Sequence, residues 1–213
     1  MHRVALPVIL VFAVACAATP ASVATPSATT SARPAASASA ATAVDTSAGA
    51  PTFSCVAPAQ PLVELTEGPY YKAGAPERDS LLTSGVAGRP LMLSGFVVTR
   101  SCRPVANAKL DFWQADGNGN YDNSGYTLRG WQVTATDGSY RLETVIPGLY
   151  PGRTEHIHVK VTPPGGKVYT SQLFFPGVAQ NERDGIFSAT MLVKLDASKT
   201  PALATFTFVV DLP

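Results

Sequence analysis

The sequence lacks several features that nucleic-acid-binding, membrane-spanning and hydrolytic proteins need. Its 213 residues include 16 lysines and arginines against 15 aspartates and glutamates, and no dense basic cluster occurs. A nucleic-acid-binding protein normally carries a basic patch. The apolar run from Val4 to Ala15 is too short to cross a bilayer as a helix, which needs about 20 apolar residues. The Gly-x-Ser-x-Gly pattern of serine hydrolases is also missing.

The same apolar run is flanked in the manner of a secretory signal. Arg3 precedes it and Cys16 follows it in the sequence MHRVALPVILVFAVAC, a pattern that favours a signal over a buried globular helix. The end of this stretch, AVAC, is similar to a bacterial lipoprotein signal, in which Cys16 would be the lipidated first residue of the mature protein. We therefore expect residues 1–16 to be a signal. The protein would be exported, as a cell-surface lipoprotein or, if the signal is cut elsewhere, as a secreted protein.

Residues 17–52 contain almost only alanine, serine, threonine, proline and valine, and Arg33 and Asp45 are the only charged residues among them. Such a segment has no large side chains from which to build a core. It predicts a disordered tether between a membrane anchor and a folded domain. The folded domain is expected over residues 53–213, which is long enough for one hydrophobic core.

Cysteine is scarce, with three residues in the whole chain. If Cys16 carries a lipid, Cys55 and Cys102 remain. An even number of cysteines in an exported domain predicts a disulfide between them. Two free buried thiols are the alternative.

Short strand-like runs separated by turn signals fill the folded part. Asp137-Gly138 and Pro147-Gly148 are two of these turn signals, and no long stretch has the periodicity of a helix. Many short strands with this spacing predict an all-β fold, either an antiparallel sandwich or a barrel. The runs span residues 91–98, 108–115, 130–136, 139–145, 156–162, 168–175, 188–195 and 204–212.

Histidine is as scarce as cysteine, and the two histidines outside the signal, His156 and His158, lie in one predicted strand. Alternate side chains of a strand share a face and start about 6.5–7 Å apart, so the two imidazoles could converge on one metal ion. A chance pair is the alternative, although two neutral histidines buried without partners would be costly. Tyr121, in a Gly/Asn-rich loop, and Tyr150, after a turn, are the best placed additional ligands.

Several stretches between residues 64 and 178 resemble the intradiol ring-cleavage dioxygenases, the family that includes catechol and protocatechuate dioxygenases. One signature of that family resembles LDFWQADGNGNY, with an acidic residue, an aromatic residue, Trp-Gln and then Gly-x-Tyr. A second signature, with tyrosine, arginine and His-x-His in that order, resembles PGLYPGRTEHIHVKV. The well-known members begin with a helical segment where this chain has its low-complexity tether, so the chain resembles a smaller, exported branch. Further similar stretches are TEGPYY, LRGWQVTATDGSYRLETVIPG and SQLFFPG.

The resemblance implies an immunoglobulin-like antiparallel β-sandwich that binds a non-haem Fe(3+) ion. It also implies a reaction in which O2 cleaves a catechol-type ring between the two hydroxylated carbons and yields a muconate-type diacid. Phenolate oxygen is a hard, anionic donor that suits the ferric state. The implied iron ligands are Tyr121, Tyr150, His156 and His158.

Catalytic and substrate-binding residues follow from the same resemblance. Tyr150 would also act as a base, Arg153 would stabilise negative charge on the substrate, and Gln172 would orient bound oxygen by a hydrogen bond. The alternative for Arg153 is a surface salt bridge, for which Glu155 is a neighbouring partner. The expected substrate-binding residues are Pro69, Tyr70 and Trp131.

One alternative function comes from the stretch TATDGSYRLETVIPGLY, which is also similar to transthyretin-like adhesion modules. An extracellular binding module without catalysis would use the same kind of sandwich. It would explain the sheet pattern but not the combination of Tyr121, Arg153 and His-x-His. The expected partners are therefore a catechol-type substrate and O2, with no nucleic acid and with membrane contact only through the lipid. The oligomeric state is left open, and a monomer is possible.

Overall fold

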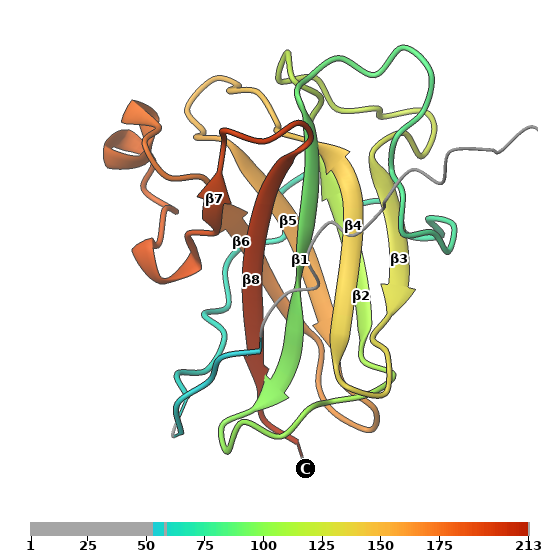
Figure 1. Cartoon of the computed structure of the whole chain (residues 1–213). Helices are drawn as coiled ribbons and strands as arrows, with labels where there is room; N and C mark the ends of the chain where they lie inside the picture. The colour runs from blue at the N-terminus through green and yellow to red at the C-terminus, as the bar shows by residue number, and fades with distance from the viewer. Residues whose placement is uncertain (1–52, 58, 213) are drawn as a thin grey trace, which may run out of the picture. The chain divides into compact units, whose positions relative to one another are not determined.

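The computed structural model describes residues 53–57 and 59–212 of the chain (Figure 1). The predicted signal over residues 1–16, its lipidated Cys16 and the predicted tether over residues 17–52 lie outside the described residues. In the described part, no helix combines the length and the apolar character that crossing a membrane requires.

Two four-stranded sheets pack face to face, which confirms the predicted all-β sandwich. One sheet, here called the β1 sheet, has the strand order β4-β1-β8-β7, and the other, the β5 sheet, has the order β3-β2-β5-β6. The β1 sheet lies in front of the β5 sheet in Figure 1. The strands are β1 (Pro90–Thr99), β2 (Lys109–Gln114), β3 (Arg129–Val133), β4 (Ser139–Val145), β5 (His156–Thr162), β6 (Tyr169–Phe174), β7 (Lys194–Asp196) and β8 (Ala202–Val210).

The hydrophobic core lies between the sheets and follows from the two-residue period of the strands. Phe112 on β2 and Ile157 and Val159 on β5 are fully buried members of this core. Burial of each such side chain stabilises the fold by roughly 1.5–3 kcal/mol relative to an exposed position. Because neighbouring side chains of a strand point to opposite faces, the residues on either side of Ile157 lie on the outer face of the β5 sheet.

Two details of the sandwich differ from the sequence prediction. β1 and β8 pair in parallel, so the β1 sheet is mixed rather than purely antiparallel. Residues 188–195, expected as one strand, form the short 3-10 helix η2 (Ala189–Met191) followed by β7 (Lys194–Asp196). Met191, in η2, is buried in the core. A second 3-10 helix, η1 (Ala179–Arg183), precedes it.

The expected disulfide between Cys55 and Cys102 is present, with the two Cα atoms 5.8 Å apart. It attaches the N-terminal stretch of the domain to the turn that follows β1. The backbone N–H of Ala59 also donates to the carbonyl of Arg100, at 2.9 Å. Both contacts hold the chain against the end of the β1 sheet.

Residues 62–81, here called the covering segment, then cross the outer face of the β5 sheet. At one edge, the N–H of Leu65 donates to the carbonyl of Thr170 on β6. At the opposite edge, the N–H of Arg78 donates to the carbonyl of Trp131 on β3. The covering segment therefore excludes water from a sheet face that would otherwise be exposed.

Candidate functional site

His156 and His158 lie on this covered outer face, as the two-residue period predicts. Their Nε2 atoms are 3.1 Å apart, and the two residues are only 2% and 1% exposed. In the sheet, His158 is paired with Trp113 on β2 and with Gln172 on β6. Both neighbours therefore share the outer face with the histidines.

Two tyrosines from different loops complete the cluster. Tyr121 belongs to the loop between β2 and β3, and Tyr150 to the loop between β4 and β5. The Tyr150 hydroxyl lies 3.4 Å from His156 Nε2. The Tyr121 ring centroid lies 5.7 Å from that of Tyr150 and 6.4 Å from that of His158. The structure thus brings together the four side chains that the sequence singles out as iron ligands.

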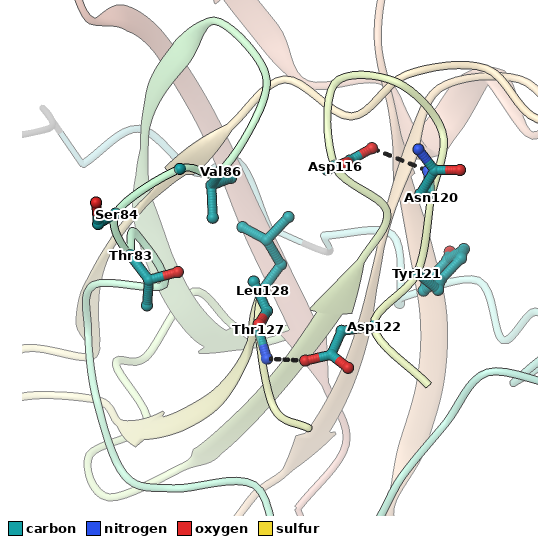
Figure 2. A pocket seen from close by; sticks show the side chains of 10 residues that line it. Thr83, Ser84, Val86, Asp116, Asn120, Tyr121, Asp122, Thr127 and Leu128 are labelled. Atoms are coloured by element: carbon teal, nitrogen blue, oxygen red, sulfur yellow. Dashed lines mark hydrogen bonds between the residues drawn. The ribbon is translucent and has the colours of Figure 1, made fainter. Parts of the chain in front are cut away.

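Glycine explains how the Tyr121 loop reaches the Tyr150 loop. Gly119 has a positive φ of 81°, and a Cβ atom there would lie 2.0 Å from the carbonyl oxygen of Leu149. A larger residue would therefore separate the two loops. The loop is closed internally by the Asp116 carboxylate, which accepts hydrogen bonds from the N–H groups of Asn118 and Asn120 at 2.9 Å. The Asp116–Asn120 bond is visible in Figure 2.

A cavity of about 300 Å³ lies beside the Tyr121 loop. Figure 2 shows it between residues 83–86 and the loop that carries Tyr121 and Leu128. Of the four converging side chains, only Tyr121 lines it. This cavity is therefore distinct from the space between the histidines and the tyrosines.

The four side chains fit a ferric ion. His156 donates from Nδ1 to the carbonyl of Thr154, at 2.6 Å, so its Nε2 lone pair is free to bind a metal. Two imidazoles that bind one ion through Nε2 must bring these atoms close together, and here they are 3.1 Å apart. The Tyr121 hydroxyl is buried and has no hydrogen-bond partner in the described part of the chain. An unpaired buried hydroxyl is costly, and a metal ligand role would remove that cost.

The donor set also favours Fe(3+) over other metals. Among residues 53–57 and 59–212, no group of three or more His, Cys, Asp or Glu side chains could hold a metal ion. The side chains that could supply anionic ligands beside the two histidines are the phenols of Tyr121 and Tyr150. Phenolate oxygen is a ligand of ferric iron, whereas zinc sites use cysteine, histidine and carboxylate.

Burial sets the protonation of these groups in the absence of a metal. It lowers the pKa of His156 to about 4 and that of His158 well below the usual histidine value. Both imidazoles are therefore neutral at pH 7, which is the form that binds metals. Burial also raises the pKa of Tyr121 and Tyr150, although the Arg153 guanidinium opposes this rise. Metal binding would have to displace the two phenol protons.

Arg153 faces the cluster rather than solvent. Its Nη1 donates to the Tyr150 hydroxyl at 3.2 Å, and its Nη2 donates to Gln172 Oε1. Gln172 is fixed in this orientation because its Nε2 donates to the carbonyl of Thr66 at 2.8 Å. The ion-pair partner of Arg153 is Asp184, at 2.9 Å from Nε, so the alternative of a surface salt bridge with Glu155 is wrong.

Asp184 and Asn181 are residues that the sequence analysis missed. Asp184 accepts hydrogen bonds from Arg153 Nε and from the backbone N–H of Thr154, both at 2.9 Å. Asn181 accepts from the Thr154 hydroxyl at 2.6 Å. Since the Thr154 carbonyl holds His156, this segment positions both the Arg153 guanidinium and the His156 ring. No local pattern in the sequence could have linked it to the site, because it lies about 30 residues away.

The structure places two of the three predicted substrate-binding residues near the cluster and the third away from it. Tyr70 stacks on Tyr121, with ring centroids 4.2 Å apart, and presents an edge to Tyr150. Pro69 is exposed in the same turn. Trp131 is not brought to the cluster: it pairs with Asp111 at the β3 edge of the sheet, and its ring contacts the Lys109 ammonium at 4.5 Å.

Comparison with known proteins agrees with this arrangement. A family model described as "Dioxygenase" matches residues 66–211, a range that includes the whole cluster. The chain belongs to the intradiol ring-cleavage dioxygenase family, as the sequence motifs indicate.

Three similar proteins illustrate the relationship. The dioxygenase domain of a dioxygenase and carbohydrate-binding protein fusion from Streptomyces sp. SirexAA-E is 47% identical, with a TM-score of 0.70 over 72% of this chain and 100% of that one. An intradiol ring-cleavage dioxygenase from Tetranychus urticae is 25% identical, with a TM-score of 0.64 over 70% and 92%. Hydroxyquinol 1,2-dioxygenase from Nocardioides simplex is 26% identical over 63% of this chain. The chain spans about half the length of the curated relatives that it matches, 54% in this last case.

Proposed function

We propose that this protein is a non-haem Fe(3+)-dependent intradiol dioxygenase. It would cleave a catechol-type ring between its two hydroxylated carbons with O2, and give a muconate-type diacid. The observation that carries the proposal is the convergence of two phenols and two neutral imidazoles on one covered sheet face. The ligands would be Tyr121, Tyr150, His156 and His158.

Tyr121, Tyr150, His156 and His158 would hold a ferric ion, and this ion would supply the Lewis acidity that makes a catechol-type ring reactive toward O2. Tyr150 is the residue that would move a proton in this reaction. Its hydroxyl oxygen, once ionised, can accept the proton of a substrate hydroxyl. Tyr150 is only partly buried, whereas His156 and His158 are almost completely buried.

Arg153 and Gln172 would act on the charge that develops beside Tyr150. The guanidinium already donates to the Tyr150 hydroxyl and is held from behind by Asp184. A positive group fixed in advance stabilises developing negative charge without further reorganisation. The Gln172 amide donates to Thr66 and fixes the guanidinium through its Oε1 atom. Its proposed contact with bound oxygen would require this amide to turn.

The substrate ring would lie against Tyr70, which already stacks on one proposed ligand. Pro69, in the same turn, would border the entrance. Relatives that act on hydroxyquinol and chlorocatechol, according to their names, support a catechol-type substrate for this chain. Trp131 is withdrawn from the proposed substrate contacts because it lies at the far edge of the sheet.

The test begins with purified protein loaded with ferric iron. We expect about one iron per chain, a red colour from charge transfer between phenolate and iron, and O2 consumption with at least one of catechol, protocatechuate, hydroxyquinol and caffeoyl compounds. A colourless protein that takes up no iron would contradict the proposal and favour the adhesion-module alternative. Loss of the colour in His158→Ala would identify the site.

We also propose that the protein is exported, and anchored by lipid on Cys16. The disulfide between Cys55 and Cys102 supports export, because disulfides persist in oxidising compartments. Fractionation of the producing cells, followed by mass measurement of the mature N-terminus, would separate a lipid-anchored product from a secreted one. A full-length product in the cytoplasm would contradict both forms of the proposal.

A further inference from the structure

The two histidines of the cluster are held in different ways. His156 is anchored by a hydrogen bond from Nδ1 to the Thr154 carbonyl at 2.6 Å. His158 Nδ1 is buried and has no hydrogen-bond partner among the described residues. Metal-binding histidines almost always donate their second ring nitrogen to an acceptor, which fixes the orientation of the ring. Something else must therefore orient His158.

The indole of Trp113 takes one face of the His158 ring. The two rings are nearly parallel, at 8°, with centroids 4.7 Å apart. Trp113 and His158 are directly paired residues of β2 and β5, so their side chains leave the sheet side by side. Tyr71 packs its ring edge-on against Trp113, with centroids 4.8 Å apart, and thereby limits movement of the indole.

Gly68 of the covering segment limits the movement of the His158 ring from another side. Its φ is +71°, and a Cβ atom built on it would lie 3.4 Å from His158 Cε1 and 3.8 Å from Nε2. The backbone therefore passes close to the ring edge that carries the metal-binding nitrogen. A side chain here would be strained by the backbone conformation, and its Cβ would be in van der Waals contact with the His158 ring.

We propose that Trp113 and Gly68 are positioning residues for His158, and that ring stacking replaces the hydrogen bond that anchors His156. The inference rests on the proposed iron site. With the indole and the backbone in place, His158 has one orientation, in which Nε2 faces His156 Nε2. Without the indole, the imidazole can rotate away from the ion, because no hydrogen bond holds its Nδ1.

The chain has only two tryptophans, and the second one, Trp131, provides a matched control. Trp131 lies on the outer face of the same sheet, but it contacts Lys109 and not the histidines. The experiment compares Trp113→Leu, Trp113→Phe and Trp131→Phe in the iron-loaded protein. It measures the rate of iron release to a chelator, the position of the phenolate-to-iron absorption band, and the melting temperature.

We expect Trp113→Leu to release iron roughly 10-fold faster, in line with other residues that orient metal ligands, and to shift the absorption band. Trp113→Phe keeps a ring against His158 and should recover most of the iron retention. Trp131→Phe should behave as the wild type. A Trp113→Leu protein with wild-type release and an unshifted band would overturn the inference while leaving the proposed function intact.

Fluorescence gives a second measurement that does not depend on the leucine variant folding. In Trp131→Phe the remaining indole is Trp113, and iron uptake should quench most of its emission because the indole stacks on a ligand. In Trp113→Phe the remaining Trp131 should be quenched far less. Equal quenching in the two variants would overturn the inference. If the wild type takes up no iron, the proposed function fails together with the inference.

Discussion

The outer faces of the two sheets bury different kinds of side chain. On the β5 sheet, the covering segment buries charged and polar side chains. On the β1 sheet, the stretch attached by the Cys55–Cys102 disulfide packs on a small apolar cluster of Phe96, Val98 and Val209. The buried polar side chains of the β5 outer face are Asp111, Arg129, His156, His158 and Gln172.

This contrast shows where chemistry can be placed on a sandwich. Burial of a charge is costly unless it is paired and hydrogen-bonded. Arg129 satisfies this condition by donating to the carbonyls of Tyr70 and Asp122. On the same covered face, the Tyr121 hydroxyl, His158 Nδ1 and Trp113 Nε1 lack such partners in the described part of the chain. Of these three groups, the Tyr121 hydroxyl is the one that a metal ion at the proposed site would bind.

The largest effect should follow from removing a ligand on the covered face. We expect His156→Ala to lower iron content to background and to abolish ring cleavage, because the site loses a buried nitrogen ligand that the Thr154 carbonyl holds in place. Metal analysis and the phenolate-to-iron absorption band measure the first effect, and O2 consumption measures the second. Full iron content with full rate would show that the ligand assignment is wrong.

Tyr150→Phe should separate catalysis from metal binding. The variant keeps three ligands but loses the oxygen that accepts the substrate proton, and general bases contribute about 100-fold or more. We therefore expect the turnover rate to fall by roughly that factor, with a smaller change in iron affinity. Single-turnover kinetics and iron titration of the same preparation provide the comparison. An equal loss in both quantities would contradict the assigned role of Tyr150.

Asp184→Asn should have a smaller effect on rate and a clear effect on stability. Breaking one partner of a buried ion pair costs on the order of 3 kcal/mol, and Arg153 would lose the carboxylate that orients it. We expect the turnover rate to fall about 10-fold, a modest effect for a residue that acts through Arg153, with KM and iron content nearly unchanged. Glu182→Gln, an exposed carboxylate in the same loop, is the matched control.

The acid dependence of stability tests the same carboxylate. Burial acts to raise the pKa of Asp184, but hydrogen bonds from Thr154, Ile186 and Arg153 outweigh it and lower the pKa overall. The stabilisation is therefore complete above the ordinary aspartate pKa of about 4 and is lost as the pH falls through the lowered value. Thermal melts below pH 4 should show a steeper loss of stability in the wild type than in Asp184→Asn. Parallel curves would contradict this account.

Reduction of the disulfide should affect stability without affecting the site. The 47-residue separation between Cys55 and Cys102 corresponds to roughly 4 kcal/mol at most, from the entropy of the unfolded chain. We expect a lower melting temperature, with iron and its colour retained at low temperature. Mass spectrometry of unreduced peptides verifies the bond first. If reduction also removed the iron colour, the disulfide on the β1 sheet would be shown to support the proposed iron site on the β5 sheet.

The smallest effect is expected for Thr205→Val, on the outer face of the β1 sheet. Thr205 lines a cavity of about 480 Å³ there, far from any residue of the proposed mechanism in the sheet order. Stability should change by no more than about 0.5 kcal/mol, and iron content and rate should be unchanged. A loss of activity would show that this face also takes part in function.

The local sequence was sufficient for those features that depend on short-range periodicity. Strands 139–145 and 156–162 have the predicted bounds, because alternation of apolar residues reports the two-residue period directly. The same period places His156 and His158 on one face. The Gly/Asn-rich loop before Tyr121 was also evident, since glycine and asparagine are turn residues. The structure adds that Gly119 approaches Leu149 too closely for a larger residue.

Other features depended on which strands and loops meet, and local patterns do not contain that information. Trp131 was expected near the substrate, but the register places it at the β3 edge. The parallel pairing of β1 with β8 and the turn at η2 were missed for the same reason.

The sequence by itself therefore determined the all-β class, the disulfide pair, the family motifs and the four side chains that we propose as iron ligands. The tertiary structure alone decided how those side chains are supported. Asp184 reaches Arg153 from a distant loop, and Trp113 meets His158 across two strands. Such contacts arise because folding brings separate segments together in order to bury apolar surface and pair the polar groups buried with it. The spacing of residues along one segment does not encode them.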